Sequence, residues 1–235
     1  MADVRWVRDR HTGRVPVLLL DDDDVRARLD PSTAVRAVRE ALIAAHSGQL
    51  HSPPRVAADL GGGNLVFTAG LMEPTGVFGF RAYDTLVGGE QLVAVWGQDD
   101  GRLRVLICGD ELGARRTGAI GAVAVDVAAR PGAIRLGLVG AGTQAWTQLW
   151  AIRAVRPVVS ATVAARRPER AAAFAERAAA EMGVTVRRSV RLLLLYDRNL
   201  VVVARTTVPV RDITKAKLDR LHDDLAPVFG KGWME

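Results

Sequence analysis

The feature that most constrains the fold of this chain is a glycine turn that joins an apolar strand to a helix. Residues 135–139 form the apolar strand, residues 140–145 have the sequence GAGTQA, and a helical pattern follows. In a GxGxxA turn the first glycine allows a tight bend, the second lets the backbone approach a pyrophosphate, and the alanine keeps the helix close to the strand. The helix N-terminus then offers free N–H groups and a positive dipole end to phosphate.

This turn predicts a nicotinamide-dinucleotide site formed by Gly140, Gly142, Thr143 and Gln144. The alternative interpretation is a βα turn that packs and binds nothing. The surrounding pattern favours the site, with strands at 134–139, 160–165 and near 200–204, and helices at 143–155 and 168–182. Alternating strands and helices of this length predict a parallel sheet with helices on its faces.

The first half of the chain has a different pattern. Residues 50–106 show short β-type runs separated by glycine, and Asp100-Gly101 between two apolar runs predicts a hairpin. We expect an antiparallel sheet there, covered by a helix between residues 30 and 48. A further helix is expected at 110–129, and the Arg-Pro-Gly sequence at 130–132 ends it. We place a domain boundary at that break, so the expected fold class is α/β, with an α+β domain preceding a Rossmann-type domain.

The composition of the 235 residues, 49% hydrophobic and 25% charged, is that of an ordinary globular protein. No apolar run is long enough to span a membrane, and no signal peptide is visible, so we expect no membrane partner. The net charge of +6 comes from scattered basic residues with few aromatic side chains among them, which argues against nucleic-acid binding. The four histidines and the single cysteine show no metal-ligand spacing, and the lone cysteine favours a cytoplasmic location.

The end of the second parallel strand indicates which dinucleotide is preferred. An acidic residue there binds the ribose 2′-hydroxyl of NAD, whereas arginine accommodates the 2′-phosphate of NADP. The sequence has Arg166 and Arg167 at this point and no carboxylate. We therefore predict that NADP(H) is favoured over NAD(H), with Arg166 as the first candidate. The alternative is that both arginines are solvated residues at the start of a helix.

Three arginines of the first half have surroundings unlike those of a solvated face. Arg55 follows two prolines that stiffen the backbone, Arg81 lies in a β-like run, and Arg116 lies at the head of an apolar helix. Guanidinium groups that converge on one pocket suit a carboxylate, because each offers a planar fork of donors. Spacing alone does not show convergence, and each arginine taken singly is more often a surface residue.

These segments resemble the ornithine cyclodeaminase/μ-crystallin family over roughly residues 15 to 210. The matching motifs are Pro53-Pro54-Arg55, Arg116-Thr117-Gly118-Ala119, the glycine turn, Arg166-Arg167-Pro168-Glu169, and the strand at 201–207 with its threonine-rich end. Several motifs in the correct order make this resemblance more specific than any one of them.

The resemblance implies a homodimer of two-domain subunits that acts on a small carboxylate-bearing substrate. Residues 1–130 would bind substrate and pair the subunits, and residues 131–211 would bind NAD(P). It also implies that Arg55, Arg81 and Arg116 hold the substrate carboxylate and that Thr117 and Thr206 lie beside the cofactor.

The sequence departs from the family at two points. The family commonly has a proton-exchanging lysine where this chain has Arg81, and arginine is a poor general base because it stays protonated. Residues 212–235 do not resemble the family's continuation, which holds a catalytic aspartate and the rest of the parallel sheet. We therefore expect a truncated Rossmann-type domain followed by a divergent tail.

The leading functional hypothesis is an NAD(P)H-dependent oxidoreductase acting on a small imino or amino acid, of the ketimine reductase or amino-acid dehydrogenase type. Arg81 in place of lysine weakens the alternative of an ornithine cyclodeaminase-type lyase. The third hypothesis is a catalytically silent NAD(P)-binding protein. Tyr83 and Asp84 lie near Arg81 in the sequence, but no proton donor is assigned.

Overall fold

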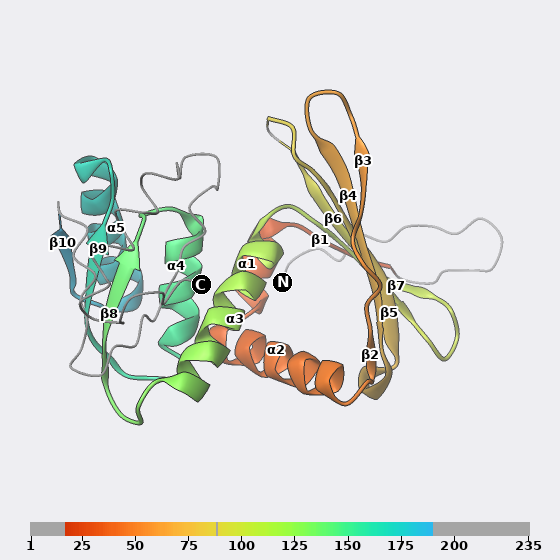
Figure 1. The fold of residues 1–235 in the computed structure, drawn as a ribbon, viewed down its shortest axis with the longest axis horizontal. Coiled ribbons are helices and arrows are strands. Elements are labelled where there is room, and N and C mark those ends of the chain that lie inside the picture. Colours follow the sequence, from red (N-terminus) through yellow and green to blue (C-terminus); the bar gives the residue numbers. More distant parts are fainter. Residues whose placement is uncertain (1–16, 88, 190–235) are drawn as a thin grey trace, which may run out of the picture.

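The fold consists of two β-sheets on opposite sides of one long helix, α3 (Glu111–Ala128), as Figure 1 shows. The computed structural model describes residues 17–87 and 89–189. The other helices are α1 (Asp22–Arg28), α2 (Pro31–His46), α4 (Thr143–Ile152) and α5 (Pro168–Met182), with a 3-10 turn, η1, at Glu73–Thr75. Helices α1, α2 and α4 all contact α3, so this helix connects the two halves of the molecule.

The first sheet, called the mixed sheet below, has seven strands. They are β1 (Leu18–Leu20), β2 (Leu50–His51), β3 (Val56–Asp59), β4 (Asn64–Met72), β5 (Val77–Asp84), β6 (Gln91–Gly97) and β7 (Leu103–Cys108). Their order is β1-β7-β6-β5-β4-β2, and β3 also pairs with β4. The predicted hairpin at Asp100-Gly101 is confirmed, because it joins β6 to β7 with Gly101 at a φ of 64°.

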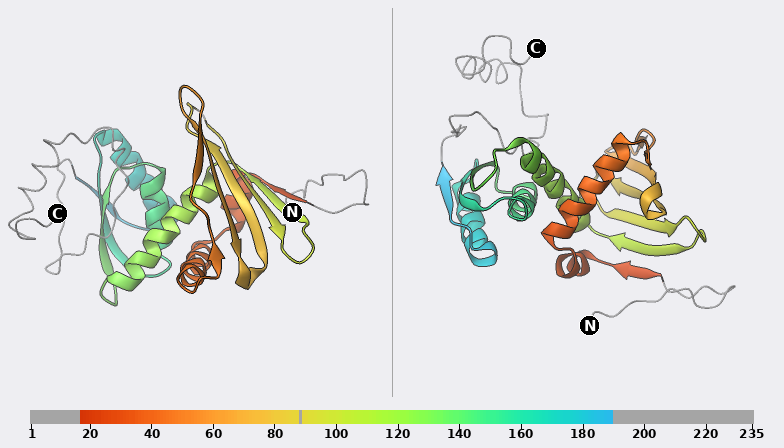
Figure 2. Two further views of the ribbon diagram at one scale, coloured as in Figure 1. Left: turned by 45° about the vertical axis from the view of Figure 1, so that its right-hand side comes forward. Right: turned by 90° about the horizontal axis from the view of Figure 1, so that it is seen from below.

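The prediction that the first sheet is antiparallel was wrong in one respect. Strand β1 runs parallel to β7, with Leu18 opposite Val105, so the sheet is mixed. Helices α2 and α3, which match the predicted helices, lie on one side of it together with α1, which was not predicted (Figures 1 and 2). The β1–β7 pair joins segments far apart in the chain, and no local pattern reveals such a pairing.

The opposite face of the mixed sheet, called the aromatic face below, carries exposed apolar side chains. The strand register puts Phe67, Phe78, Phe80 and Trp96 on this face. Phe78 stacks on Trp96 with ring centroids 5.8 Å apart, and Phe80 lies 5.7 Å from Trp96. Val56, on the same face, is 65% exposed, and Phe67 is 41% exposed. Within the described part of the chain no helix lies over this face (Figure 2).

The second sheet is parallel and follows the predicted alternation of strands and helices. Its strands are β8 (Ile134–Val139), β9 (Val158–Ala164) and β10 (Val186–Ser189), in the order β10-β9-β8. Strand β10 was not predicted, whereas the strand expected near 200–204 and the tail at 212–235 lie outside the described residues. Helix α3 ends at Ala128 and β8 begins at Ile134, so the predicted domain boundary falls in the connection between them.

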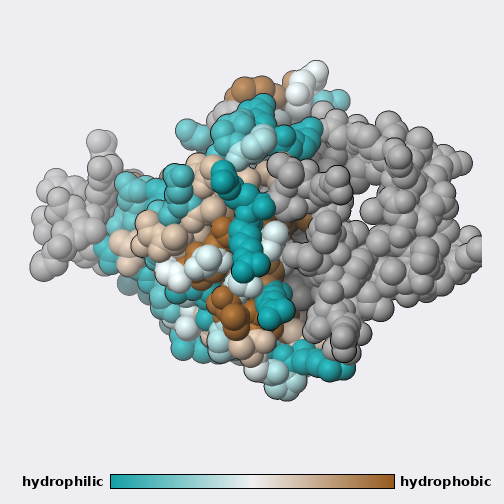
Figure 3. All heavy atoms as spheres, turned by 90° about the vertical axis from the view of Figure 1, so that its left-hand side faces the viewer, coloured by the Kyte–Doolittle hydropathy of each residue, from teal (hydrophilic) through white to brown (hydrophobic). Residues whose placement is uncertain are grey.

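Helices α4 and α5 lie over one face of the parallel sheet. Parallel sheets are usually covered on both faces. On the side of the molecule shown in Figure 3, apolar surface lies among hydrophilic side chains. The main apolar core lies between this sheet, α4, α5 and α3, and it contains Leu136, Leu138, Leu149, Ile152 and Val163.

Helix α3 packs against α4 at a distance that only glycine permits. A Cβ atom on Gly118 would lie 2.2 Å from the backbone oxygen of Thr147, and one on Gly121 would lie 1.8 Å from Oε1 of Gln148. At Gly118 the clash would be with backbone, so the helices would have to separate, whereas at Gly121 the end of the Gln148 side chain would have to move. The two glycines therefore determine how closely the helix of the first half approaches the helix that follows the glycine turn.

Two polar side chains fix α1 against the start of α3. Asp22 Oδ1 accepts a hydrogen bond from the backbone N–H of Glu111 at 2.9 Å and so caps α3. Arg115 donates from Nη1 to the backbone oxygen of Leu29, at the end of α1, and from Nε to Glu111 at 2.7 Å. Arg115 is only 11% exposed in its side chain, so it acts as a structural cross-link between the two helices.

Asp126 connects three parts of the molecule through its carboxylate. It accepts hydrogen bonds from Arg39 of α2 and from Arg156, which follows α4, while Arg156 Nη2 also donates to the backbone oxygen of Asp126 at 2.6 Å. The hydrogen bond from Arg39, followed by the charge of Arg156, lowers the pKa of Asp126 below its ordinary value of 3.8. This ion-pair network holds α2, α3 and the α4–β9 connection together.

We predict that Asp126→Asn lowers the free energy of unfolding by about 1–3 kcal/mol, because it removes the charge that two arginines share. Since the folded-state pKa of Asp126 is lowered, its contribution is complete above pH 4 or so and is lost as pH falls through that lowered pKa. Urea denaturation at neutral and acidic pH measures both effects.

The matched control is Glu40→Gln, which removes an exposed ion pair with Arg36 at 4.0 Å on α2. We expect this control to change stability by less than about 0.5 kcal/mol. Equal losses in the two variants would contradict the structural role of Asp126.

Candidate functional site

The glycine turn has the geometry that a phosphate-binding turn requires. Gly140 adopts a φ of 97°, in the region that favours glycine, and its N–H donates to the backbone oxygen of Ala164 at 2.7 Å. Gly142 is the N-cap of α4, and no side chain caps this helix. A Cβ atom on Gly142 would meet no other atom within 4 Å. The N-terminus of α4 is therefore open to an anion that approaches the backbone closely.

Gln144 adds a polar group that the described residues leave unsatisfied. Its Oε1 atom is buried and has no hydrogen-bond partner. Buried polar atoms are almost always paired, so an orphaned acceptor beside a helix N-terminus fits a site that a ligand completes. Thr143, one residue earlier, is exposed. Gly142, Thr143 and Gln144 thus fit the dinucleotide predicted from the sequence.

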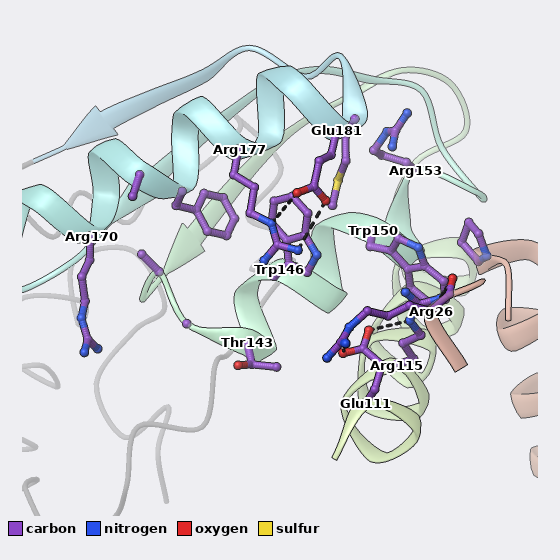
Figure 4. Close-up of a pocket in the computed structure, with 16 residues that line it drawn as sticks. Arg26, Glu111, Arg115, Thr143, Trp146, Trp150, Arg153, Arg170, Arg177 and Glu181 are labelled. Atoms are coloured by element: carbon purple, nitrogen blue, oxygen red, sulfur yellow. Dashed lines mark hydrogen bonds and ion pairs between the residues drawn. The ribbon is translucent and has the colours of Figure 1, made fainter. Parts of the chain in front are cut away.

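A pocket of about 950 Å³ begins at the glycine turn and runs along the outer face of α4 (Figure 4). Trp146 and Trp150 form its floor, with α5 on one side and the start of α3 on the other. The guanidinium of Arg177 lies 3.8 Å from the ring centroid of Trp146, and that of Arg115 lies 4.6 Å from the ring centroid of Trp150. Each arginine can make a cation–π contact with its ring.

Basic side chains gather where β9 ends, as the sequence predicts. Arg166 and Arg167 are both exposed, and Arg167 is the N-cap residue of α5. Arg170, in the first turn of α5, lines the pocket that contains Gly142 and Thr143. Sequence reasoning missed Arg170, although its position three residues after Arg167 was a signal that this helix starts with a basic turn.

The mixed sheet brings two of the three predicted substrate-binding arginines near each other. Arg81 lies in β5 opposite Thr68 of β4, on the face toward α3 and opposite the aromatic face. Arg55 directly precedes β3, whose first residue, Val56, pairs with Phe67 of β4. The charges of Arg55 and Arg81 are close enough to act on each other.

The start of α3 brings the third arginine to the same place. A Cβ atom on Gly113 would lie 3.5 Å from Nη2 of Arg81, so α3 approaches the sheet closely at this residue. Arg116 lies three residues later on the same side of the helix. Burial lowers the pKa of Arg81, and the positive charges of Arg116 and Arg55 lower it further. We call Arg55, Arg81 and Arg116 the arginine cluster.

Two residues that sequence reasoning missed hold Arg81. Its Nε donates to Oε1 of Gln91 at 2.8 Å, and its Nη2 donates to the same oxygen. Nε2 of Gln91 in turn donates to Oδ1 of Asp110, the residue before α3. The guanidinium also lies 4.3 Å from the ring centroid of Tyr83. The strand alternation around Gln91 gave no sign of this role, because hydrogen bonds between segments depend on the tertiary fold.

Thr117 lies on α3 between the arginine cluster and α4. Its hydroxyl donates to the backbone oxygen of Gly113 at 2.9 Å, and its own backbone oxygen accepts from Nε2 of Gln148 at 3.5 Å. Gln148 follows Gln144 by one helical turn, so Thr117 lies on the side of α3 that faces the helix of the glycine turn. Thr206, the other residue assigned to the cofactor by resemblance, lies outside the described residues.

The pocket and the arginine cluster lie on different sides of α3. At about 100° per residue, Glu111 and Arg115 point away from Gly113 and Arg116. The pocket is lined by Glu111 and Arg115 and by none of the three cluster arginines. The cavity in Figure 4 therefore coincides with the glycine turn but not with the predicted substrate site.

The described residues contain no group of three or more His, Cys, Asp or Glu side chains placed to hold a metal ion. Within those same ranges no helix is both long and apolar enough to cross a bilayer.

A family model described as the ornithine cyclodeaminase/mu-crystallin family matches residues 17–210, most of the sequence. The chain belongs to this family. Among characterised proteins, it is 36% identical to L-lysine cyclodeaminase of Streptomyces rapamycinicus over 127 residues, which is 54% of this chain and 35% of the relative. The resemblance inferred from the motifs is thereby confirmed.

Solved structures share the fold of the described part. The Δ1-pyrroline-2-carboxylate reductase of Thermococcus litoralis, in complex with NADH and L-proline, aligns with a TM-score of 0.67 and 25% identity over 74% of this chain and 57% of its own. The iminosuccinate reductase of Paracoccus denitrificans, in complex with NAD+, aligns with a TM-score of 0.64 and 25% identity over 74% and 56%. The chain thus spans about a third of the curated relative and just over half of these structures.

Proposed function

We propose that this member of the family is an NADPH-dependent oxidoreductase that reduces the carbon–nitrogen double bond of a small imino acid. The observation that carries the proposal is the open, uncapped N-terminus of α4 at Gly142, on a helix packed against the same α3 that presents Arg116. The cofactor supplies the hydride when it is bound. Two reductases of similar fold were solved with NADH and NAD+, which supports this class of chemistry.

In the proposed site, the cofactor and the substrate would meet beside α3. Gly142, Thr143 and Gln144 would hold the pyrophosphate through backbone N–H groups, and the unpaired Oε1 of Gln144 would accept from a donor of the dinucleotide, such as a ribose hydroxyl. Thr117 would lie toward the nicotinamide end, and the arginine cluster would orient the substrate carboxylate so that the imino carbon contacts the nicotinamide. Three guanidinium groups offer several charge-assisted hydrogen bonds to one carboxylate.

We also propose that the protein is cytoplasmic and is divided into a substrate domain at 1–130, a cofactor domain at 131–211 and a tail at 212–235.

The second candidate activity is a cyclodeaminase-type lyase, which the 36% identity to a lysine cyclodeaminase favours. The presence of Arg81 argues against the lyase activity, because a protonated guanidinium is a poor general base. Its charge suits a reductase in which Arg81 holds an anion, while a separate group donates the proton that the product amine gains.

We predict that NADPH binds more tightly than NADH, because Arg166 and Arg167 at the end of β9 attract the 2′-phosphate. Arg166→Ala should reduce this preference by about tenfold while leaving NADH affinity nearly unchanged. Titration of each dinucleotide, followed by tryptophan fluorescence, measures the dissociation constants. Tighter binding of NADH than of NADPH by the unmodified protein would contradict the predicted preference.

The same titration tests whether the glycine turn is the binding site. Gly142→Asp places a carboxylate where the pyrophosphate would approach, and we expect it to weaken both dinucleotides at least about tenfold. The matched control is Gly62→Asp, because Gly62 also has open space and an ordinary φ but lies in the β3–β4 loop. Unchanged binding by the Gly142 variant would show that the turn packs without binding a dinucleotide.

The proposed activity is tested by following NADPH oxidation with a panel of cyclic imine carboxylates and of α-keto acids mixed with amines. We expect turnover with at least one imino acid, and Arg55→Gln should raise KM about tenfold because Arg55 holds the carboxylate. Ammonia release from L-lysine or L-ornithine in the presence of the oxidised dinucleotide, with no net change in its redox state, would support the lyase instead. Dinucleotide binding without turnover on any substrate would support a silent binding protein.

We further propose that the aromatic face pairs two copies of the chain. Exposed contiguous apolar surface of this kind marks an interface. Phe78→Asp should convert a dimer to a monomer in light scattering coupled to size-exclusion chromatography, because it buries a charge against Trp96. Ile43→Asp on α2, where Ile43 is 61% exposed, is the control and should remain dimeric. A dimer that survives Phe78→Asp would place the interface elsewhere.

A further inference from the structure

The side chain of Arg81 is held in one orientation by an uncharged partner. Its guanidinium has five N–H donors, one on Nε and two on each Nη atom. Oε1 of Gln91 accepts from Nε at 2.8 Å and from Nη2, so it occupies one edge of the guanidinium. The outer edge, formed by Nη1 and the remaining Nη2 hydrogen, keeps the parallel pair of donors that suits a carboxylate.

Asp110 determines which way the Gln91 amide points. Its Oδ1 accepts from Nε2 of Gln91, and a carboxylate accepts hydrogen bonds without donating them. The amide nitrogen is thereby held toward Asp110 and the amide oxygen toward Arg81. Gly113 makes room for this arrangement, because a Cβ atom there would lie 2.9 Å from Oε1 of Gln91.

The neutrality of Gln91 matters for binding an anion. A glutamate at the same place would form an ion pair with Arg81 and cancel part of the charge that attracts a substrate carboxylate. Asp110 carries a charge that also attracts Arg81, but the hydrogen bonds join the two side chains only through the Gln91 amide. The chain of hydrogen bonds therefore orients the guanidinium without a direct hydrogen bond from Arg81 to a carboxylate.

We infer that Gln91, oriented by Asp110, is a positioning residue that turns the outer edge of the Arg81 guanidinium toward the substrate carboxylate. This inference rests on the proposed function, because it assumes that the arginine cluster binds a carboxylate. In this inference, Gln91 and Asp110 affect substrate binding by orienting Arg81 and do not contact the substrate themselves. Arg55 and Arg116 are exposed, so Arg81 is the member of the cluster with a fixed direction.

The test compares Gln91→Leu with Gln98→Leu in the full chain, using the best imino acid from the panel and NADPH. Gln91→Leu should raise KM about tenfold or more, change kcat less than about threefold, and leave the NADPH dissociation constant unchanged. Gln91→Glu should raise KM further. Gln98 is exposed just after β6, and its variant should match the unmodified protein. An unchanged KM for Gln91→Leu would overturn the inference.

Asp110 supplies a second variant that does not disturb the sheet. Asp110 is exposed and makes no side-chain cap to α3, so its replacement should leave folding intact. Asp110→Ala should raise KM severalfold because the Gln91 amide is then free to flip, and Asp110→Asn should restore KM because its carbonyl can accept the same hydrogen bond. Equal KM values for the alanine and asparagine variants would contradict the positioning role.

Crystal structures of the unmodified protein and of Gln91→Leu test, without any turnover assay, whether Gln91 orients the Arg81 guanidinium. We expect the Arg81 guanidinium to turn away from its original direction in the variant, and an unmoved guanidinium would overturn the inference. If the unmodified protein turns over no imino acid, the proposed function fails, while the two crystal structures still show whether Gln91 directs Arg81.

Discussion

The structure depends on the close packing of α3 against the elements on either side of it. Gly118 and Gly121 let α4 approach on one side, and Gly113 lets the mixed sheet approach near its start. Any larger residue at these positions would push the neighbouring backbone or a buried amide away. Because α4 follows the glycine turn and Arg116 belongs to α3, this packing also determines the separation of the proposed cofactor and substrate sites.

Arginine has two distinct roles around this helix. Arg115 and Arg156 are largely enclosed and donate to backbone oxygens, so they join elements of the fold. Arg55 and Arg116 are exposed beside Arg81 and raise the local positive potential. Two neighbours in the chain, Arg115 and Arg116, thus serve opposite purposes because a helix turns about 100° per residue.

The proposed chemistry rests on two positively charged regions, the N-terminus of α4 and the arginine cluster. The N-terminus of α4 presents N–H groups and a helix dipole, and the arginine cluster presents guanidinium groups, so both sites favour anions. Gln91 is neutral, and Asp110 is hydrogen-bonded to Gln91 and not to Arg81, so the Arg81 guanidinium is oriented without a direct hydrogen bond to a carboxylate. A small imino acid with a carboxylate and a dinucleotide with phosphates meet these requirements together.

The glycine turn, the alternating strands and helices after it, the hairpin at Asp100-Gly101 and the family could all be predicted from the amino-acid sequence. Each of these features depends on residues close together in the chain, because helix periodicity, turn chemistry and the steric needs of glycine act over a few residues. The pairing of β1 with β7, the hydrogen bonds from Arg81 to Gln91, and the proximity of the charges of Arg55 and Arg116 to Arg81 could not be predicted from local sequence and emerge from the folded structure. These contacts join segments distant in the chain, and their formation depends on how α3 packs between its two neighbours.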